Sequence, residues 1–289
     1  MRCPVFLVAA LFSSFAFLPA QAAPDCARLL KRADGSSFVL WFAQKQGSDA
    51  QLAELCLTRV PILTRGQFKP EGAKTLAAPN PVLARRAGAK HQGAALVIIN
   101  IEEWKTWKTD VATIRRSVDW LMLTAAAVKE GAGGAPVGYY SMVPAFNYWD
   151  AMAGEGTGRY RRWQENNDLL RPLAEAVDAL FPTVYTHYRE DYERWRRYAL
   201  AQVSESRRIG PGKPIYPFVW DRYHEANFSL GNGFIEPEFL AFQLEALFKA
   251  KETAGLVIWR PAKEKWLPDS NLVQALQMFL AKREAANVN

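Results

Sequence analysis

The chain has 289 residues, of which 49% are hydrophobic and 22% charged, and its formal net charge is +7. This composition excludes an intrinsically disordered chain and a coiled coil, and the spread of 18 glycines and 17 prolines excludes a collagen-like or low-complexity one. The length allows one large domain or two small ones, because barrels commonly exceed about 200 residues as a single unit.

The first residues have the pattern of a secretory signal peptide. A basic residue precedes an apolar run over 5–18, and a small-x-small cleavage site follows at 20–22. The run is shorter than the roughly 20 apolar residues that a membrane span needs, and no later run approaches that length. We therefore expect a leader over 1–22 and an exported protein, secreted or periplasmic, that forms a single domain over 23–289 and has no stable membrane span.

Two cysteines remain after the predicted leader. In an oxidising compartment Cys26 and Cys56 are expected to form one disulfide. The alternative is a pair of buried, unpaired thiols, and the distance between the two Cα atoms decides between them.

Strand-like and helix-like segments alternate along the chain. Runs rich in branched and aromatic residues predict strands over Ser37–Phe42, Val60–Thr64, Ala94–Ile101, Pro136–Ser141, Thr183–Thr186, Ile215–Trp220 and Gly255–Trp259. Helices are predicted over Asp110–Lys129, Leu169–Leu180, Tyr188–Ser206, Glu236–Ala254 and Ser270–Ala286. Because several strands are apolar throughout, as in parallel sheets buried on both faces, we predict an α/β fold, a single distorted TIM-like (β/α) barrel with about seven parallel strands. An open doubly wound sheet is the alternative, but no glycine-rich phosphate loop follows an early strand.

Several kinds of function find little support in the motifs. The three histidines, His91, His187 and His224, are not at metal-ligand spacing, and no cofactor or transition-metal site is predicted. Calcium or magnesium held by carboxylates stays open. No Gly-x-Ser-x-Gly turn indicates a serine hydrolase. The arginines of 194–197 wrap around a helix, so we interpret them as solvated surface and expect no nucleic-acid partner.

The most informative segment runs from the apolar strand at Ala94 to Trp104. Asn100 and Glu102 are two residues apart and should therefore point to the same face at the carboxyl end of this strand, where barrel enzymes keep their active sites. A carboxylic acid there, among aromatic rings, would have its pKa raised by desolvation and could serve as a general acid. The alternative is that Glu102 begins a solvated loop and pairs with an arginine.

Aromatic and polar residues also close other predicted strands, and they would surround the same cavity. Tyrosine and tryptophan offer a flat apolar face with one polar atom, which suits sugar rings. The residues concerned are Tyr139 and Tyr140, Tyr185, Trp220 with Asp221 and Arg222, and Trp259.

In these residues the chain resembles the hyaluronidase-like glycoside hydrolases, the bee-venom and mammalian hyaluronidase group. The resemblance is that of a divergent, bacterial-type member. The likeness extends in collinear order over roughly Ala94–Trp259. Its motifs are Ile-Asn100-Ile-Glu102-Glu-Trp104, Gly138-Tyr139-Tyr140, Asn167-Asp168 leading to Phe181-Pro-Thr-Val-Tyr185, Trp220-Asp-Arg-Tyr223 and Gly255-Leu-Val-Ile-Trp259.

The resemblance implies a retaining hydrolysis in which the substrate's own N-acetyl carbonyl attacks the anomeric carbon. Glu102 matches the family's acid/base residue. Tyr185 matches a tyrosine that contacts the acetamido group, and Trp259 matches the tryptophan that walls its pocket. We also expect sugar contacts from Tyr139, Tyr140, Trp220 and Arg222.

One position departs from the family pattern, because Asn100 stands where the family has aspartate. An amide can hold a hydrogen bond, but it cannot offset the positive charge of an oxazolinium-like intermediate. The enzyme could act more slowly on an N-acetylhexosamine polymer, use Asp221 as a nucleophile about 5 Å from Glu102, or only bind glycans.

The sequence thus favours an exported glycoside hydrolase with a polysaccharide substrate, N-acetylhexosamine-containing or anionic. The positive net charge is compatible with an anionic polymer. A non-catalytic glycan-binding barrel and a structural envelope protein are the alternatives.

Overall fold

The computed structural model describes residues 24–187 and 191–288. The predicted leader over 1–22 lies outside these residues. The strands are β1 (Val39–Phe42), β2 (Leu57–Arg59), β3 (Ile62–Thr64), β4 (Val97–Asn100), β5 (Val137–Tyr139), β6 (Phe218–Trp220) and β7 (Gly255–Trp259). The helices are α1 (Cys26–Leu29), α2 (Asp49–Ala53), α3 (Pro81–Ala89), α4 (Val111–Gly131), α5 (Tyr148–Ala151), α6 (Gly158–Asp168), α7 (Arg171–Ala176), α8 (Tyr192–Ile209), α9 (Pro237–Lys249) and α10 (Asn271–Val288), with a 3-10 turn, η1, at Arg65–Gln67.

The strands pair in parallel, as predicted, but they form two sheets instead of one continuous barrel sheet. The order is β2-β1-β7-β6 in one sheet and β3-β4-β5 in the other. The strand predicted over Val60–Thr64 is divided at Pro61, which has no N–H to donate to a ladder. The chain changes partner at this point: the Val60 N–H donates to Phe42 of β1, while the Pro61 carbonyl accepts from Ile98 of β4.

The strand predicted over Thr183–Thr186 is present only as isolated bridges. Phe181 pairs with Tyr140 beyond β5, and Thr183 pairs with Phe218 of β6, both in parallel. The segment 180–186 therefore links the far edges of the two sheets. Three prolines in or near this region, at 182, 214 and 217, remove donors that longer ladders would need.

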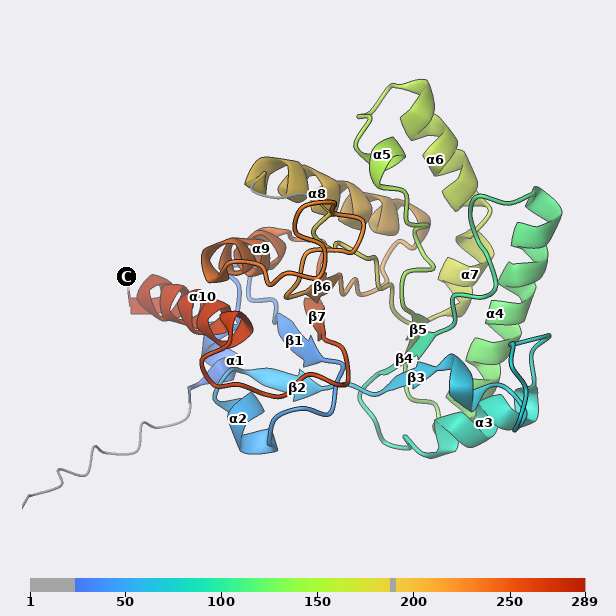
Figure 1. Ribbon diagram of the computed structural model, residues 1–289, viewed down its shortest axis with the longest axis horizontal. Helices are drawn as coiled ribbons and strands as arrows, with labels where there is room; N and C mark the ends of the chain where they lie inside the picture. The colour runs from blue at the N-terminus through green and yellow to red at the C-terminus, as the bar shows by residue number, and fades with distance from the viewer. Residues whose placement is uncertain (1–23, 188–190, 289) are drawn as a thin grey trace, which may run out of the picture.

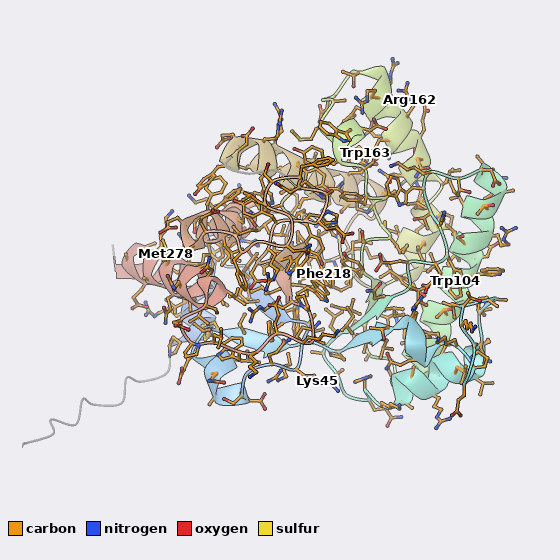
Figure 2. The ribbon with its side chains drawn as sticks, viewed as in Figure 1. Lys45, Trp104, Arg162, Trp163, Phe218 and Met278 are labelled. Atoms are coloured by element: carbon orange, nitrogen blue, oxygen red, sulfur yellow. A yellow bond between two sulfur atoms is a disulfide. The ribbon has the colours of Figure 1, made fainter. Side chains whose placement is uncertain are left out.

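Successive side chains of a strand alternate between a core inside the sheets and a core between the sheets and the helices. One set faces the inside, between the sheets, and consists mainly of aromatic residues such as Trp41, Phe181 and Phe218. The other set packs outward against the helices, as Leu40 and Ile99 do. Phe218, labelled near the centre of the molecule in Figure 2, is fully buried. Because side chains in a strand alternate, this two-sided burial decides which strand-end residues face the site.

Helices cover the outer faces of both sheets (Figure 1). Helices α3 and α4 pack on each other beside the three-stranded sheet, while α9 and α10 pack together beside the four-stranded sheet. Asp110 is the N-cap of α4, since its carboxylate accepts from the Thr113 N–H at 2.8 Å. Helix α6 was not predicted because its sequence is almost entirely polar, with buried side chains at Tyr160, Trp163 and Asn167.

The predicted disulfide is confirmed. Cys26 at the start of α1 is bonded to Cys56, and their Cα atoms are 5.4 Å apart, within the range that a disulfide requires. The bond joins the first described segment to the turn before β2. No helix in the part of the chain that the structure describes is long and apolar enough to cross a membrane.

Candidate functional site: an acidic residue between two aromatic cavities

Glu102 lies two residues beyond the end of β4, and three cavities meet at its side chain. The Arg65 cavity, of about 450 Å³, is lined by Thr64, Arg65, Asn100, Glu102 and Glu103. The tryptophan cavity, of about 220 Å³, contains Trp220 and Trp259, and the histidine cavity, of about 190 Å³, contains His187 and His224. Glu102 lines all three, so a ligand that crosses from one cavity to another passes its carboxyl group.

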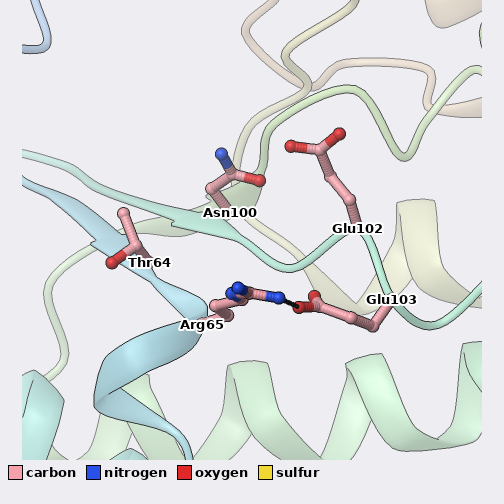
Figure 3. Close-up of a pocket in the computed structure, with 5 residues that line it drawn as sticks. All are labelled: Thr64, Arg65, Asn100, Glu102 and Glu103. Atoms are coloured by element: carbon pink, nitrogen blue, oxygen red, sulfur yellow. Dashed lines mark hydrogen bonds and ion pairs between the residues drawn. The ribbon is translucent and has the colours of Figure 1, made fainter. Parts of the chain in front are cut away.

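Asn100 and Glu102 share a face, as their spacing predicts. Figure 3 shows both side chains on one side of the chain, while Glu103 turns toward Arg65. The arginine pairs with Glu103, at 2.9 Å between Nη1 and Oε1, and not with Glu102. Among the described residues Glu102 makes no ion pair, so its carboxyl group stays available to a ligand.

The surroundings of Glu102 favour its protonated form. Burial on its protein side raises the pKa of Glu102 above the ordinary value, the Asn100 amide lowers it, and the negative charge of Glu103 raises it. The residue as a whole is nevertheless exposed, so the desolvation acts on the side of the carboxyl group that faces the cavities and its effect on the pKa is moderated by solvent. A raised pKa extends to higher pH the range in which a carboxylic acid keeps the proton that it can donate to a departing oxygen.

Four aromatic side chains surround the inner side of the tryptophan cavity. Tyr185 is at the centre of this group, with its ring centroid 6.2 Å from Tyr140, 5.6 Å from Trp220 and 6.3 Å from Trp259. Trp220 and Trp259 meet edge to face at 5.2 Å. Burial raises the pKa of Tyr140 to about 12 and that of Tyr185 well above its usual range, so both phenols keep their proton and can donate it in hydrogen bonds.

The structure separates Tyr139 from this group and corrects its expected role. Tyr139 and Tyr140 are consecutive, so they point to opposite faces of the strand. Tyr140 lines both the tryptophan and the histidine cavity, whereas Tyr139 packs in the outer core and donates from its hydroxyl to the Leu121 carbonyl of α4 at 2.8 Å. Tyr139 is a core residue and not a sugar contact.

Asp221 and Arg222 also lie away from the three cavities. Asp221 is buried and pairs with the buried Arg260 at 2.9 Å, and burial raises its pKa to about 6 against the opposing effect of Arg260. Arg222 is bound to Glu264 at 2.6 Å and stacks on Phe234 at 3.8 Å. Asp221, the expected nucleophile, is therefore part of an internal ion pair. Arg222, the expected sugar contact, instead fixes a loop through Glu264 and Phe234.

The sequence missed the histidine pair. His187 and His224 are far apart in the chain, yet their ring centroids lie 4.4 Å apart, and both line the histidine cavity with Trp107 and Phe146. Burial lowers the pKa of His187 to about 3 and also lowers that of His224. Both residues follow predicted strand ends, which is the signal that could have found them. Within the described ranges, no cluster of three or more His, Cys, Asp or Glu side chains forms a metal site.

The arginines of α8 are largely engaged in ion pairs with nearby acids. Arg196 pairs with Glu193 at 2.7 Å, and Arg208 pairs with Asp168 at 2.8 Å. The surface of this helix is thus a mixture of charges and not a continuous basic face.

Comparison with known proteins supports the fold. No family model matches the sequence, and no curated protein matches it. The structure is similar to the crystal structure of bee venom hyaluronidase, with a TM-score of 0.62 and 15% identity over 87% of this chain and 99% of that one. It is similarly related to bee venom hyaluronidase in complex with a hyaluronic acid tetramer, with a TM-score of 0.59, 14% identity, and coverage of 87% of this chain and 98% of the other.

The fold is therefore a distant version of the hyaluronidase fold, which agrees with the resemblance found in the sequence motifs. Both similar chains are bee venom hyaluronidase, and the similarity extends over nearly their whole length. At this level of identity the likeness establishes the arrangement of strands and helices. The chemistry has to be argued from the site itself.

Proposed function

We propose that the protein is a glycoside hydrolase that cleaves a polysaccharide, with Glu102 as the general acid and then the general base. The observation that carries this proposal is the position of Glu102 where three cavities meet. Among the described residues Glu102 has no ion-pair partner, and its pKa is raised. A carboxyl group between two aromatic cavities can protonate a glycosidic oxygen that bridges sugars on its two sides. The likeness in fold to bee venom hyaluronidase supports the same function.

The tryptophan cavity is the natural place for the sugar that is attacked. We propose that its acetamido group lies between Tyr185 and Trp259, as the family resemblance implies, with Trp220 as a further sugar contact. Its carbonyl oxygen then bonds to the anomeric carbon while Glu102 transfers its proton to the leaving oxygen. In the second step Glu102 takes a proton from water, which adds to the anomeric carbon and restores the acetamido group. The ion pair of Asp221 with Arg260, away from the three cavities, supports this substrate-assisted route over one with Asp221 as nucleophile.

Asn100 is expected to orient the acetamido group and to limit the rate. It lines the tryptophan cavity beside Glu102, so its amide can accept from or donate to the acetamido group. It cannot balance the positive charge that develops on the intermediate. We also propose that the two sheets, linked by the isolated bridges of segment 180–186 and by the chain over 57–64, form one distorted barrel of about seven strands.

Product analysis on a polysaccharide panel tests the proposed function. Wild type and Glu102→Gln are incubated with chitin oligosaccharides, hyaluronan and uncharged glucans, and reducing ends are measured. We expect Glu102→Gln to lose about 10²- to 10⁴-fold in rate, the usual contribution of a general acid. Equal rates for both proteins would remove Glu102 from the mechanism. Binding without product would support a glycan-binding protein instead, and neither binding nor product would favour a structural role.

We further propose that the protein is exported. The Cys26–Cys56 disulfide supports an oxidising compartment, because disulfides are rare in reducing ones. Sequencing the amino terminus of the protein secreted from its host would test the predicted cleavage after residue 22, and an intact Met1 would contradict it.

A further inference from the structure

The two cavities on either side of Glu102 offer neutral and acidic groups to a ligand. In the tryptophan cavity Glu102 is joined by a second carboxylate, Glu225, from the loop after β6. The histidine cavity adds the hydroxyl groups of Thr106, Ser141 and Thr183. Among the described residues that line these two cavities, none is a lysine or an arginine. A carboxylate on a sugar in the tryptophan cavity would therefore meet like charge with no cation in the lining. The Lys108 ammonium lies outside the lining of the histidine cavity, over the Trp107 ring at 4.3 Å from its centroid.

Two arginines next to the cavities in the fold or in the chain already have carboxylate partners. Arg65, in the Arg65 cavity, pairs with Glu103 at 2.9 Å. Arg222, two residues before His224, is held by Glu264 at 2.6 Å. To pair with a sugar carboxylate, either arginine would first have to leave an existing carboxylate, so neither is a ready binding partner.

The two imidazoles are neutral hydrogen-bonding groups. The Ala226 N–H donates to Nδ1 of His224 at 3.1 Å, so that nitrogen carries no proton and the ring is uncharged, with its N–H at Nε2. The His187 side chain is 7% exposed, and its Nε2 has no partner among the described residues. A buried polar atom without a partner costs free energy, and a ligand hydroxyl in the histidine cavity would satisfy it.

We propose that the sugars bound on both sides of Glu102 are uncharged, and that Glu225 determines this specificity by repelling a uronate. This inference rests on the proposed function and names its substrate class. The hydroxyl groups of such sugars hydrogen bond to His187, His224 and Glu225, and their apolar faces lie on Trp107, Phe146 and the two tryptophans of the tryptophan cavity. A uronic acid carboxylate would lose its water to enter a space that already holds a carboxylate. The protein's positive net charge does not oppose this, because specificity is set by the groups that touch the ligand.

Calorimetric titration of the Glu102→Gln protein tests the inference without turnover. The probes are chitohexaose and cellohexaose, which are uncharged, and a hyaluronan hexasaccharide, which carries carboxylates. We expect an uncharged probe to bind at least about 10-fold more tightly than the hyaluronan probe. Adding Glu225→Gln should improve hyaluronan binding about 5-fold, the effect of removing a charge about 8 Å away at an effective dielectric constant of about 40.

Two controls make the result specific. The improvement should shrink as salt is raised, and the binding of the uncharged probes should change less than about 2-fold. Glu238→Gln, an exposed acid in the first turn of α9, changes the net charge equally and should leave all three affinities unchanged. Glu225→Ala serves if Glu225→Gln fails to fold.

The outcomes separate the inference from the proposed function. Hyaluronan bound as tightly as the uncharged probes, or unaffected by both Glu225 variants, overturns the inference and leaves a glycosidase. Failure to bind any of the three, together with no product from the polysaccharide panel, overturns both.

Discussion

Replacing Asn100 by aspartate should move the pH dependence of the reaction toward higher pH. Glu102 must be protonated to act as the acid, so kcat/KM falls as the pH rises through its pKa, which burial has already raised. Alternate residues of a strand lie about 6.5 Å apart. At that distance, and at an effective dielectric constant of about 40 for a partly exposed pair, a new negative charge favours the protonated form by about 1.3 kcal/mol. This corresponds to an upward shift of about one pKa unit.

The assay is a profile of kcat/KM between pH 3 and pH 9 on an N-acetylated oligosaccharide, for wild type, Asn100→Asp and Asn100→Ser. The serine variant removes the amide without adding charge. The difference between the two variants therefore isolates the electrostatic effect, which high salt should reduce. Because two carboxyl groups titrate together, the upper apparent pKa of the pair is the one that controls the alkaline limb. An alkaline limb that stays at the wild-type position in a folded Asn100→Asp protein would refute the role of Glu102 as acid. A faster maximal rate would also support assistance by the acetamido group.

Three further predictions concern residues that act through the fold. Asp221→Asn should cost about 2 kcal/mol in denaturant unfolding, because it removes one of the two carboxylates that pair with the buried Arg260 and leaves only Glu264, while the folded protein stays active. A loss of about 10³-fold in kcat with unchanged stability would instead identify Asp221 as a nucleophile. Removing the disulfide with Cys26→Ala and Cys56→Ala, which lie 30 residues apart in the chain, should lower the unfolding free energy by about 3.5 kcal/mol, and unchanged thermal unfolding would contradict the structure. Gly138→Ala should abolish folding or lower the melting temperature strongly, because its Cβ would overlap the backbone of the adjoining segment. The matched change Gly66→Ala points into open space, and an equal loss in both would show that the close approach is not the cause.

Much of the site could be predicted from the sequence because its signals are local. An apolar run followed by Asn100 and Glu102 indicates a strand that ends in two polar side chains on one face, and the structure has that arrangement. The aromatic residues at the other strand ends are brought together because parallel strands bring their carboxyl ends to one edge. Tyr140, Tyr185 and Trp259 were found in this way.

Errors arose where the sequence did not say which face a residue occupies. Tyr139 and Asp221 each adjoin a residue that lines a cavity. The alternation of strand side chains places Tyr139 in the outer core and turns Asp221 away from the cavities, to Arg260. A strand that is apolar on both sides gives no signal of which face is inside, because both faces are buried.

The sequence by itself determined that the chain alternates between strands and helices, that its cysteines could pair, and that an acid follows a buried strand. It did so because hydrophobic periodicity and residue type report on local structure and burial. Only the tertiary structure decided which acid has no ion pair, since Arg65 reaches Glu103 from the 3-10 turn after β3. It also brought together His187 and His224, because contacts between residues far apart in the chain depend on how the sheets pack and leave no local pattern in the sequence.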